Sequence, residues 1–292
     1  VCNLAILLKF CRGKKVLSVS WKDGGYPGIK ELSPWLNIKT LYFPFDGPSM
    51  NIKVEESLEL IEREKPDCIF FGSSFILFPQ PVKIIGENFK GLKVYDASHV
   101  LGLIAGKRFQ DPLGEGCEFM IGSTHKSFPG PQGGIILSNH DIFLDLEKDI
   151  YLKVLDNAHW NRIASLAYTL LEMRSFGEKY ADQIIKNSKV LAKSLHELGV
   201  KVKAKDFGFT ESHQVILEEG KVVADKLERV NILVDEGVRI GVSEVTRRGM
   251  KEKEMEEIAE AIHYVIVKDN YVEADKIVKR LVKEFQGIEY TF

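Results

Sequence analysis

Residues 67–98 of this 292-residue chain read DCIFFGSSFILFPQPVKIIGENFKGLKVYDAS. Two runs in this stretch, 67–74 and 93–98, are short, rich in β-branched or aromatic residues, and end in small or turn-forming residues. These features are typical of buried strands. Between the two runs, the pattern of residues 82–89 indicates a helix. A strand, a helix and a second strand in this order predict a βαβ unit with parallel strands.

The same alternation continues on both sides of this unit. Further strands are expected at 15–20, 40–45 and 117–124, and residues 54–65 place apolar side chains on one helical face with glutamates on the other. The first half of the chain therefore predicts an α/β domain around a mostly parallel sheet. Ligands of such domains bind beyond the carboxyl ends of the strands.

The second half has a different pattern and predicts a smaller α+β domain. The expected elements are helices at 162–174 and 177–198, strands at 200–205, 214–218 and 237–242, and helices at 251–267 and 274–285. A boundary near 172–177, where a glycine separates two long helices, divides the chain into domains 1–174 and 175–292.

Composition narrows the class of protein. The 40 basic and 42 acidic residues leave a formal charge of −2, so no global field favours nucleic acid or an anionic membrane. The longest apolar runs are far shorter than the roughly 20 residues that a membrane span requires. The four cysteines show neither CxxC pairing nor zinc-ligand spacing, and we expect reduced thiols in a cytoplasmic protein.

Polar side chains gather where three of the predicted strands end. These groups are Ser73 and Ser74, then Asp96 and His99, then Ser123, His125 and Lys126 with the glycine-rich residues 130–134. In a parallel sheet they converge at one edge. A lysine amine, a carboxylate and hydroxyls together suit pyridoxal phosphate, since the amine bonds to the aldehyde, the carboxylate keeps the pyridine nitrogen protonated, and hydroxyls bind phosphate.

The motifs around these residues resemble those of the serine hydroxymethyltransferase family. YDASHVLGLIAGKRFQDPL at 95–113 is similar to D-x-A-H-x-x-G-L-x-A-G, and STHKSFPGPQGG at 123–134 to T-T-T-T-H-K-T-x-x-G-P-R-G-G. GVRIGVSEVTRRGMKEKEMEEIAEAI at 237–262 resembles a segment of the family's carboxyl-terminal domain. The resemblance covers nearly the whole chain. It implies the fold of type I pyridoxal phosphate enzymes, with a seven-stranded type of large domain and homodimers whose active sites are shared between subunits.

The resemblance also implies roles for the residues beside the lysine. Lys126 corresponds to the lysine that forms the Schiff base, and Asp96 to the partner of the pyridine nitrogen. Ser123 and His125 flank the lysine at positions of cofactor contacts, with His125 counted among the catalytic residues.

Five further positions follow from the same resemblance. His99 and Ser74 correspond to groups near the cofactor's phenolic oxygen and the substrate carboxylate. Gly133 and Gly134 fall in a loop that reaches the phosphate of the neighbouring subunit. Arg248 matches the arginine that binds the carboxylate of the amino acid, a task that suits the guanidinium fork.

The chain departs from the family pattern at several positions. Tyr26 stands where the family has a histidine that stacks on the pyridine ring, and Gln132 replaces an arginine. The family's phosphate loop would end at Cys2 and Asn3, so we expect its remainder, together with the general-base glutamate, upstream of Val1. The folate-contacting part of the family is not recognisable.

The resemblance implies reversible conversion of serine to glycine, with transfer of the one-carbon unit to a reduced pterin, either tetrahydrofolate or a methanopterin-like carrier. Two other classes remain open. A different pyridoxal phosphate enzyme, such as a threonine aldolase or one acting on a tRNA-linked substrate, would keep Lys126 and Asp96 but need no pterin. A non-catalytic paralogue would need neither residue.

Overall fold

The computed structural model describes residues 1–151, 153–218, 221–235 and 239–292. The chain forms two compact units, Val1–Leu171 and Glu172–Phe292, and each is described by itself. A single helix, α7 (Trp160–Glu197), runs across the border between them. The prediction of two helices separated near residue 175 is therefore wrong. Gly177 lies inside α7 without interrupting it, because one glycine weakens a helix by only about 1 kcal/mol.

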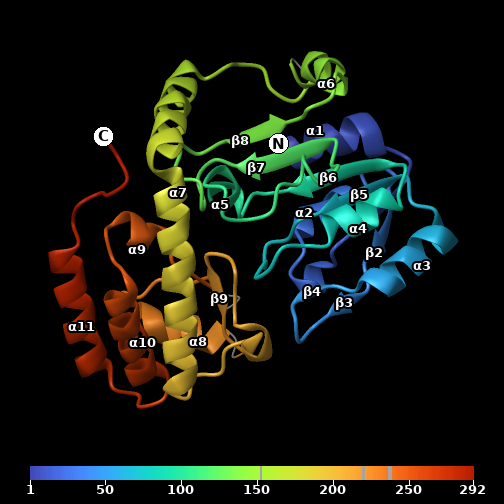
Figure 1. Ribbon diagram of the computed structural model, residues 1–292. Helices are drawn as coiled ribbons and strands as arrows, with labels where there is room; N and C mark the ends of the chain where they lie inside the picture. Colours follow the sequence, from blue (N-terminus) through green and yellow to red (C-terminus); the bar gives the residue numbers. More distant parts are fainter. Residues whose placement is uncertain (152, 219–220, 236–238) are drawn as a thin grey trace. The chain divides into compact units, whose positions relative to one another are not determined.

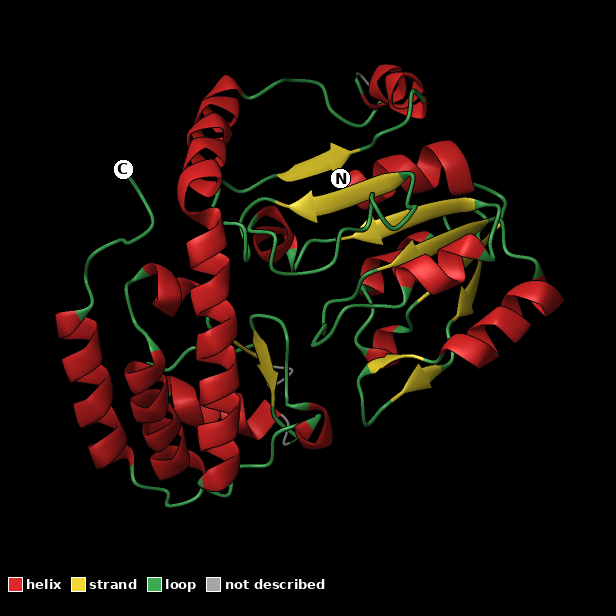
Figure 2. Ribbon diagram, viewed as in Figure 1, coloured by secondary structure: helices red, strands yellow, loops and turns green. Residues whose placement is uncertain are grey.

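The first unit is built on a six-stranded sheet with the strand order β2-β1-β5-β6-β7-β8 (Figures 1 and 2). The strands are β1 (Lys15–Ser18), β2 (Lys39–Tyr42), β5 (Cys68–Phe71), β6 (Leu92–Asp96), β7 (Phe119–Ser123) and β8 (Gly134–Leu137). The first five are parallel, and all five were predicted over longer ranges, of which those for β2 and β6 begin one residue late. The unpredicted β8 pairs with β7 in the antiparallel direction. The described sheet thus has one strand fewer than the seven expected.

Short helices and one small hairpin surround this sheet. The helices are α1 (Cys2–Ile6), continued by a π-helical turn (Leu7–Cys11), α2 (Pro27–Leu32), α3 (Val54–Glu64), α4 (Val82–Glu87), α5 (Leu101–Ala105) and α6 (Ile142–Ile150). The hairpin consists of β3 (Phe45–Asp46) and β4 (Asn51–Ile52). The predicted helices at 54–65 and 82–89 are confirmed as α3 and α4.

The core of the first unit explains why its central strand β5 is a continuous apolar run. Successive side chains of β5 point to opposite faces of the sheet, and all four are buried. One face packs against α1 and the π-helical turn; this cluster includes Ile6, Leu7, Cys11, Val16, Cys68, Phe70, Val94, Phe119 and Ile121. Burial of such a side chain stabilises the fold by about 1.5–3 kcal/mol. The core therefore fixes the strands, and with them the positions of the strand ends.

The second unit is an α+β structure, as expected. Besides its part of α7, it contains β9 (Gln214–Ile216), β10 (Arg239–Gly241), α8 (Lys221–Glu228), α9 (Ser243–Arg247), α10 (Glu252–Ile266) and α11 (Tyr271–Glu284). The two strands are antiparallel, and α10 packs against both α8 and α11. Across the described ranges, no helix is both long and apolar enough to pass through a membrane.

One predicted strand of the second unit is wrong and another is confirmed in part. Residues 200–205 form no strand, because Val202 makes an isolated bridge and Ala204 adopts a left-handed conformation (φ 57°) that starts a 3₁₀ turn. The strand expected at 237–242 is found as β10. Its first two expected positions, 237 and 238, lie outside the described residues.

Candidate functional site

The ends of three neighbouring strands are held together by direct contacts. Gly72, which follows β5, has φ +89°, and a Cβ atom there would lie 2.1 Å from the Asp96 carbonyl oxygen. Only glycine permits this approach between the ends of β5 and β6. The Ser123 N–H at the end of β7 donates to the Ser98 hydroxyl at 3.2 Å. The three strand ends therefore form one continuous edge.

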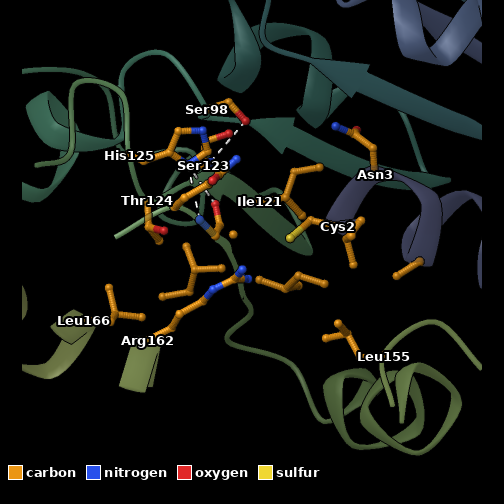
Figure 3. Close-up of a pocket in the computed structure, with 18 of the residues that line it drawn as sticks. Cys2, Asn3, Ser98, Ile121, Ser123, Thr124, His125, Leu155, Arg162 and Leu166 are labelled. Carbon is orange, nitrogen blue, oxygen red and sulfur yellow. Dashed lines mark hydrogen bonds between the residues drawn. The ribbon is translucent and has the colours of Figure 1, made fainter. Parts of the chain in front are cut away.

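A cavity of about 1000 Å³ opens beside this edge. Every predicted site residue of the first unit lines it: Tyr26, Ser74, Asp96, His99, Ser123, His125, Lys126, Gly133 and Gly134. Figure 3 shows the part of the wall that Ser98, Ser123, Thr124 and His125 contribute. The parallel sheet thus brings together residues from sequence positions 26 to 134.

Lys126 lies in a turn that follows β7, next to an imidazole. Its Nζ is 3.0 Å from Nε2 of His99. The turn is fixed by α5, since the Gly102 N–H donates to the Ser127 hydroxyl at 3.1 Å. A Cβ atom at Gly102 would lie 2.2 Å from the Ser127 carbonyl oxygen, so the helix and the turn are in close contact. This packing presents the lysine amine to the cavity.

Asp96 is held from two sides. Its Oδ2 accepts a hydrogen bond from Nδ2 of Asn3 at 2.8 Å, and its Oδ1 accepts from the Ser98 N–H at 2.9 Å. The residue is only 9% exposed. An ionised carboxylate offers about four lone-pair positions, so two remain for a donor in the cavity. Asp96 is therefore an oriented acceptor whose Oδ1 closes an Asx turn at the end of β6, while its Oδ2 binds the distant Asn3.

The glycine-rich loop 130–134 is tied to the residues before the lysine. The Gly133 N–H donates to Nδ1 of His125 at 3.2 Å, and the Thr124 N–H donates to the Gly133 carbonyl at 3.1 Å. A Cβ atom at Gly134 would lie 2.6 Å from Sγ of Cys2. The absence of a side chain at Gly134 lets the loop and α1 approach each other across the cavity wall.

Tyr26 enters the cavity from the loop before α2. The Ser74 N–H donates to the Gly24 carbonyl at 2.7 Å, which ties this loop to the end of β5. A Cβ atom at Gly28 would lie 2.5 Å from Cζ of Tyr26, so the ring lies over this glycine. The tyrosine is 41% exposed and lines the cavity, where its flat face can contact a ligand.

The cavity residues that were not predicted include Asn3 and Arg162. In the sequence, Asn3 was identified only as the last residue of the family's phosphate loop, whereas in the structure its side chain donates a hydrogen bond to Asp96. Arg162 extends from α7 into the cavity (Figure 3). A single arginine on a helix has no pattern that marks it, so no feature of the sequence indicated it.

The two neighbouring arginines of the second unit have different surroundings. Nη2 of Arg247 is 2.8 Å from Oε2 of Glu172, which is 4% exposed, and its Nη1 donates to the Tyr290 carbonyl at 2.5 Å. Arg248 has a 41% exposed side chain and weaker contacts, with Nε 3.4 Å from Glu244 Oε1. Arg247 is thus a structural residue, whereas Arg248 keeps guanidinium donors available.

These residues fit pyridoxal phosphate. The cavity presents an amine for the aldehyde, an oriented carboxylate with lone pairs beyond its two hydrogen bonds, and a glycine-rich stretch of wall at Gly133 and Gly134. Oδ1 of Asn3 is also buried in this wall without a hydrogen-bond partner. Among the residues that the structure describes, no group of three His, Cys, Asp or Glu side chains could hold a metal ion.

Comparison with known proteins gives a consistent result. The sequence profile of serine hydroxymethyltransferase matches residues 46–262. The serine hydroxymethyltransferase of Archaeoglobus fulgidus is 40% identical, over 100% of this chain and 73% of that protein. The serine hydroxymethyltransferase of Methanocaldococcus jannaschii is 39% identical, over 100% of this chain and 75% of that protein. A solved structure of L-threonine transaldolase from Pseudomonas fluorescens, in its internal aldimine state, has a TM-score of 0.91 and 30% identity, and covers 99% of this chain and 72% of its own.

Proposed function

Because the chain belongs to the serine hydroxymethyltransferase family, we propose that it uses pyridoxal phosphate to convert serine reversibly to glycine. The one-carbon unit passes to a reduced pterin. The observation that carries this proposal is the opening of the Lys126 amine and the Asp96 carboxylate into one cavity. A lysine that binds the aldehyde and a carboxylate partner for the ring nitrogen are groups by which proteins bind and tune pyridoxal phosphate.

Each group has a defined task in cleavage of the Cα–Cβ bond of serine. When bound, pyridoxal phosphate supplies a sink for the electrons that the broken bond leaves on Cα. Lys126 binds the aldehyde carbon through its amine, and His99 lies beside that amine. Asp96 holds a proton at the ring nitrogen, since it lines the cavity and has lone pairs beyond its two hydrogen bonds. Arg248 binds the serine carboxylate.

The remaining residues hold the ligand in place. Ser74 and Ser123 offer hydroxyls at the ends of β5 and β7. Tyr26 takes the place of the family's stacking histidine, and its phenol ring offers an aromatic face for stacking. Gly133 and Gly134 belong to the loop that reaches a phosphate group. His125, whose Nδ1 accepts from Gly133, keeps this loop beside the lysine.

We further propose a cytoplasmic homodimer with shared active sites. Large apolar side chains of α6 and of the first turns of α7 are exposed: Leu144, Trp160, Ile163, Leu170 and Leu171. Monomeric proteins rarely leave many such side chains in water, so a second copy is a suitable cover. The four free cysteines suit a reducing compartment.

The similarity to a threonine transaldolase favours one alternative. That enzyme shares the fold at 30% identity, and an aldol reaction on another hydroxy amino acid would use the same lysine and carboxylate without a pterin. A non-catalytic paralogue is a weaker alternative, because a scaffold needs neither Lys126 nor Asp96.

The test is glycine formation by the purified protein loaded with pyridoxal phosphate. We expect serine cleavage to depend on tetrahydrofolate or tetrahydromethanopterin, and the two carriers are compared in parallel. Glycine formation from threonine that is faster than from serine, and that is independent of either carrier, would instead support the alternative. Lys126→Ala serves as the inactive control.

A further inference from the structure

We propose that Asn3 is a positioning residue that orients the Asp96 carboxylate toward the ring nitrogen of the cofactor. Nδ2 of Asn3 donates to Oδ2 of Asp96 at 2.8 Å, although 93 positions separate the two residues. The Ser98 N–H holds the other oxygen at 2.9 Å. With one fixed donor on each oxygen, rotation of the carboxylate is restricted, and its other lone pairs are available to a donor in the cavity that Asp96 lines. This inference rests on the proposed role of Asp96.

A neutral donor is suited to this task. Asp96 forms no ion pair with any lysine, arginine or histidine in the described part of the chain, and it is 9% exposed. A cation at position 3 would neutralise the carboxylate and compete with the ring N–H for it. The amide of Asn3 fixes the same oxygen without adding a charge.

The amide of Asn3 has only one workable orientation. Its Oδ1 is buried and has no hydrogen-bond partner. Exchange of the amide oxygen and nitrogen would place two oxygens against each other at Asp96, so the nitrogen must face the carboxylate. A buried acceptor without a donor is unfavourable. An asparagine at this site is therefore explained by its donor to Asp96 and not by a general structural role.

The position of Asn3 is itself well fixed. It lies in the first turn of α1, which packs against β7, β8 and α6. Ala5 and Ile6 of the same helix are buried in the core cluster of the sheet. Figure 3 shows Asn3 at the edge of the cavity, on the side where α1 lies. A substitution at Asn3 should thus leave the helix in place and change only the contact with Asp96.

The test combines a double-mutant cycle with a change of cofactor. Asn3→Ala, Asp96→Asn and the double variant are compared, with Leu8→Ala, exposed on the same helical segment, as the control. Loss of a hydrogen bond to a charged group predicts a fall in kcat of about 10- to 100-fold for Asn3→Ala, with KM for serine changed by less than about threefold. In the Asp96→Asn background, the same substitution should change kcat by less than about threefold.

A second measurement does not depend on turnover. The visible absorption of the bound cofactor is recorded against pH. The pH at the midpoint of the absorption change should shift in Asn3→Ala but not in Leu8→Ala. With a deaza analogue of pyridoxal phosphate, in which carbon replaces the ring nitrogen, the Asn3→Ala protein and the unchanged protein should give the same spectrum. Equal loss of activity in both Asp96 backgrounds, or an effect of Asn3→Ala that persists with the deaza analogue, would overturn the inference.

The outcomes also separate this inference from the proposed function. In one outcome, the unsubstituted protein does not cleave serine, but Asn3→Ala still changes the absorption of the bound cofactor, and only when Asp96 and the ring nitrogen are present. This outcome contradicts the proposed reaction and supports the role of Asn3. A protein that cleaves serine at the same rate with and without Asn3 contradicts the role of Asn3 alone.

Discussion

Lys126 and His99 meet at the edge of the sheet, with Nζ of the lysine 3.0 Å from Nε2 of the histidine. The lysine follows β7, and the histidine follows the neighbouring parallel strand β6. His99 is 9% exposed, so its ring is held by the surrounding structure. The contact sets the direction of the amine that, in the proposed function, binds the cofactor.

This contact predicts that His99 is required for turnover rather than for folding. His99→Ala should reduce kcat by about 10-fold or more, since it removes a hydrogen bond to a group that is charged in part of the cycle. His99→Gln, which keeps a polar group near the amine, should lose less. Glycine formation is measured beside thermal unfolding, with the exposed His140→Ala as control. Equal rates for His99→Ala and His140→Ala would contradict this role.

The close approach of Gly72 to Asp96 predicts that a substitution at Gly72 lowers the stability of the protein. Gly72→Ala would place a methyl group 2.1 Å from the Asp96 carbonyl oxygen, at a φ of +89°. We expect a loss of about 3 kcal/mol or more in the free energy of unfolding. Gly13→Ala is the matched control, because its φ is +72° with no atom within 4 Å, and should lose only about 1 kcal/mol. Urea unfolding measures the free energy of unfolding of both variants. Similar losses in Gly72→Ala and Gly13→Ala would show that the backbone moves to accommodate the methyl group at position 72, and would contradict the prediction.

Cys2 predicts a pH-dependent modification rate. Burial raises the pKa of the Cys2 thiol, with a smaller contribution from the charge of Asp96. Only the thiolate reacts, so a raised pKa means slow modification at pH 7 and a rate that still increases, about tenfold per pH unit, up to pH 9. Cys11, Cys68 and Cys117 are buried and should react only after unfolding.

Iodoacetamide labelling followed by mass spectrometry checks this expectation, with Cys2→Ser as the control. A rate at Cys2 that reaches a plateau below pH 8 would contradict the burial of this thiol in the cavity wall.

The two arginines predict opposite phenotypes. Arg247→Ala leaves the buried Glu172 without its partner, and should lower the free energy of unfolding by about 3 kcal/mol. Arg248→Ala should leave stability nearly unchanged but weaken serine binding about 100-fold, because a bidentate contact with a carboxylate is lost. Serine binding and thermal unfolding are measured for both variants. The reverse assignment of the two effects would show that Arg247 is the substrate ligand.

The sequence was most informative where one physical rule dominated. The central strands β5 and β7 were predictable because strands buried on both faces are mostly apolar runs, whereas the edge strand β2 is partly exposed and was found from its β-branched and aromatic residues. The convergence of Asp96, His99 and Lys126 followed from that topology. The motif around Lys126 then pointed to the cofactor.

Other features depend on contacts between distant positions, which a local pattern does not contain. The bond between Asn3 and Asp96 spans 93 positions. The alternating residues 200–205 look like a strand, but only Val202 makes an isolated bridge, and Ala204 adopts a left-handed conformation. The stretch with Gly177 looked like a boundary between two helices, yet α7 continues through it, because one glycine weakens a helix only slightly. Strand β8 is short and follows a glycine-rich loop, so it could not be distinguished from that loop.

The most direct test of the account is reduction of the protein with borohydride in the presence of pyridoxal phosphate, followed by peptide mass spectrometry. We predict that the reduced cofactor is attached to Lys126, and that Lys126→Ala loses both the label and the visible absorption band while it still binds the cofactor non-covalently. Lys107→Ala, outside the cavity wall, should label like the unchanged protein. Labelling at another lysine, or an unchanged band in Lys126→Ala, would contradict the assignment of this cavity as the active site.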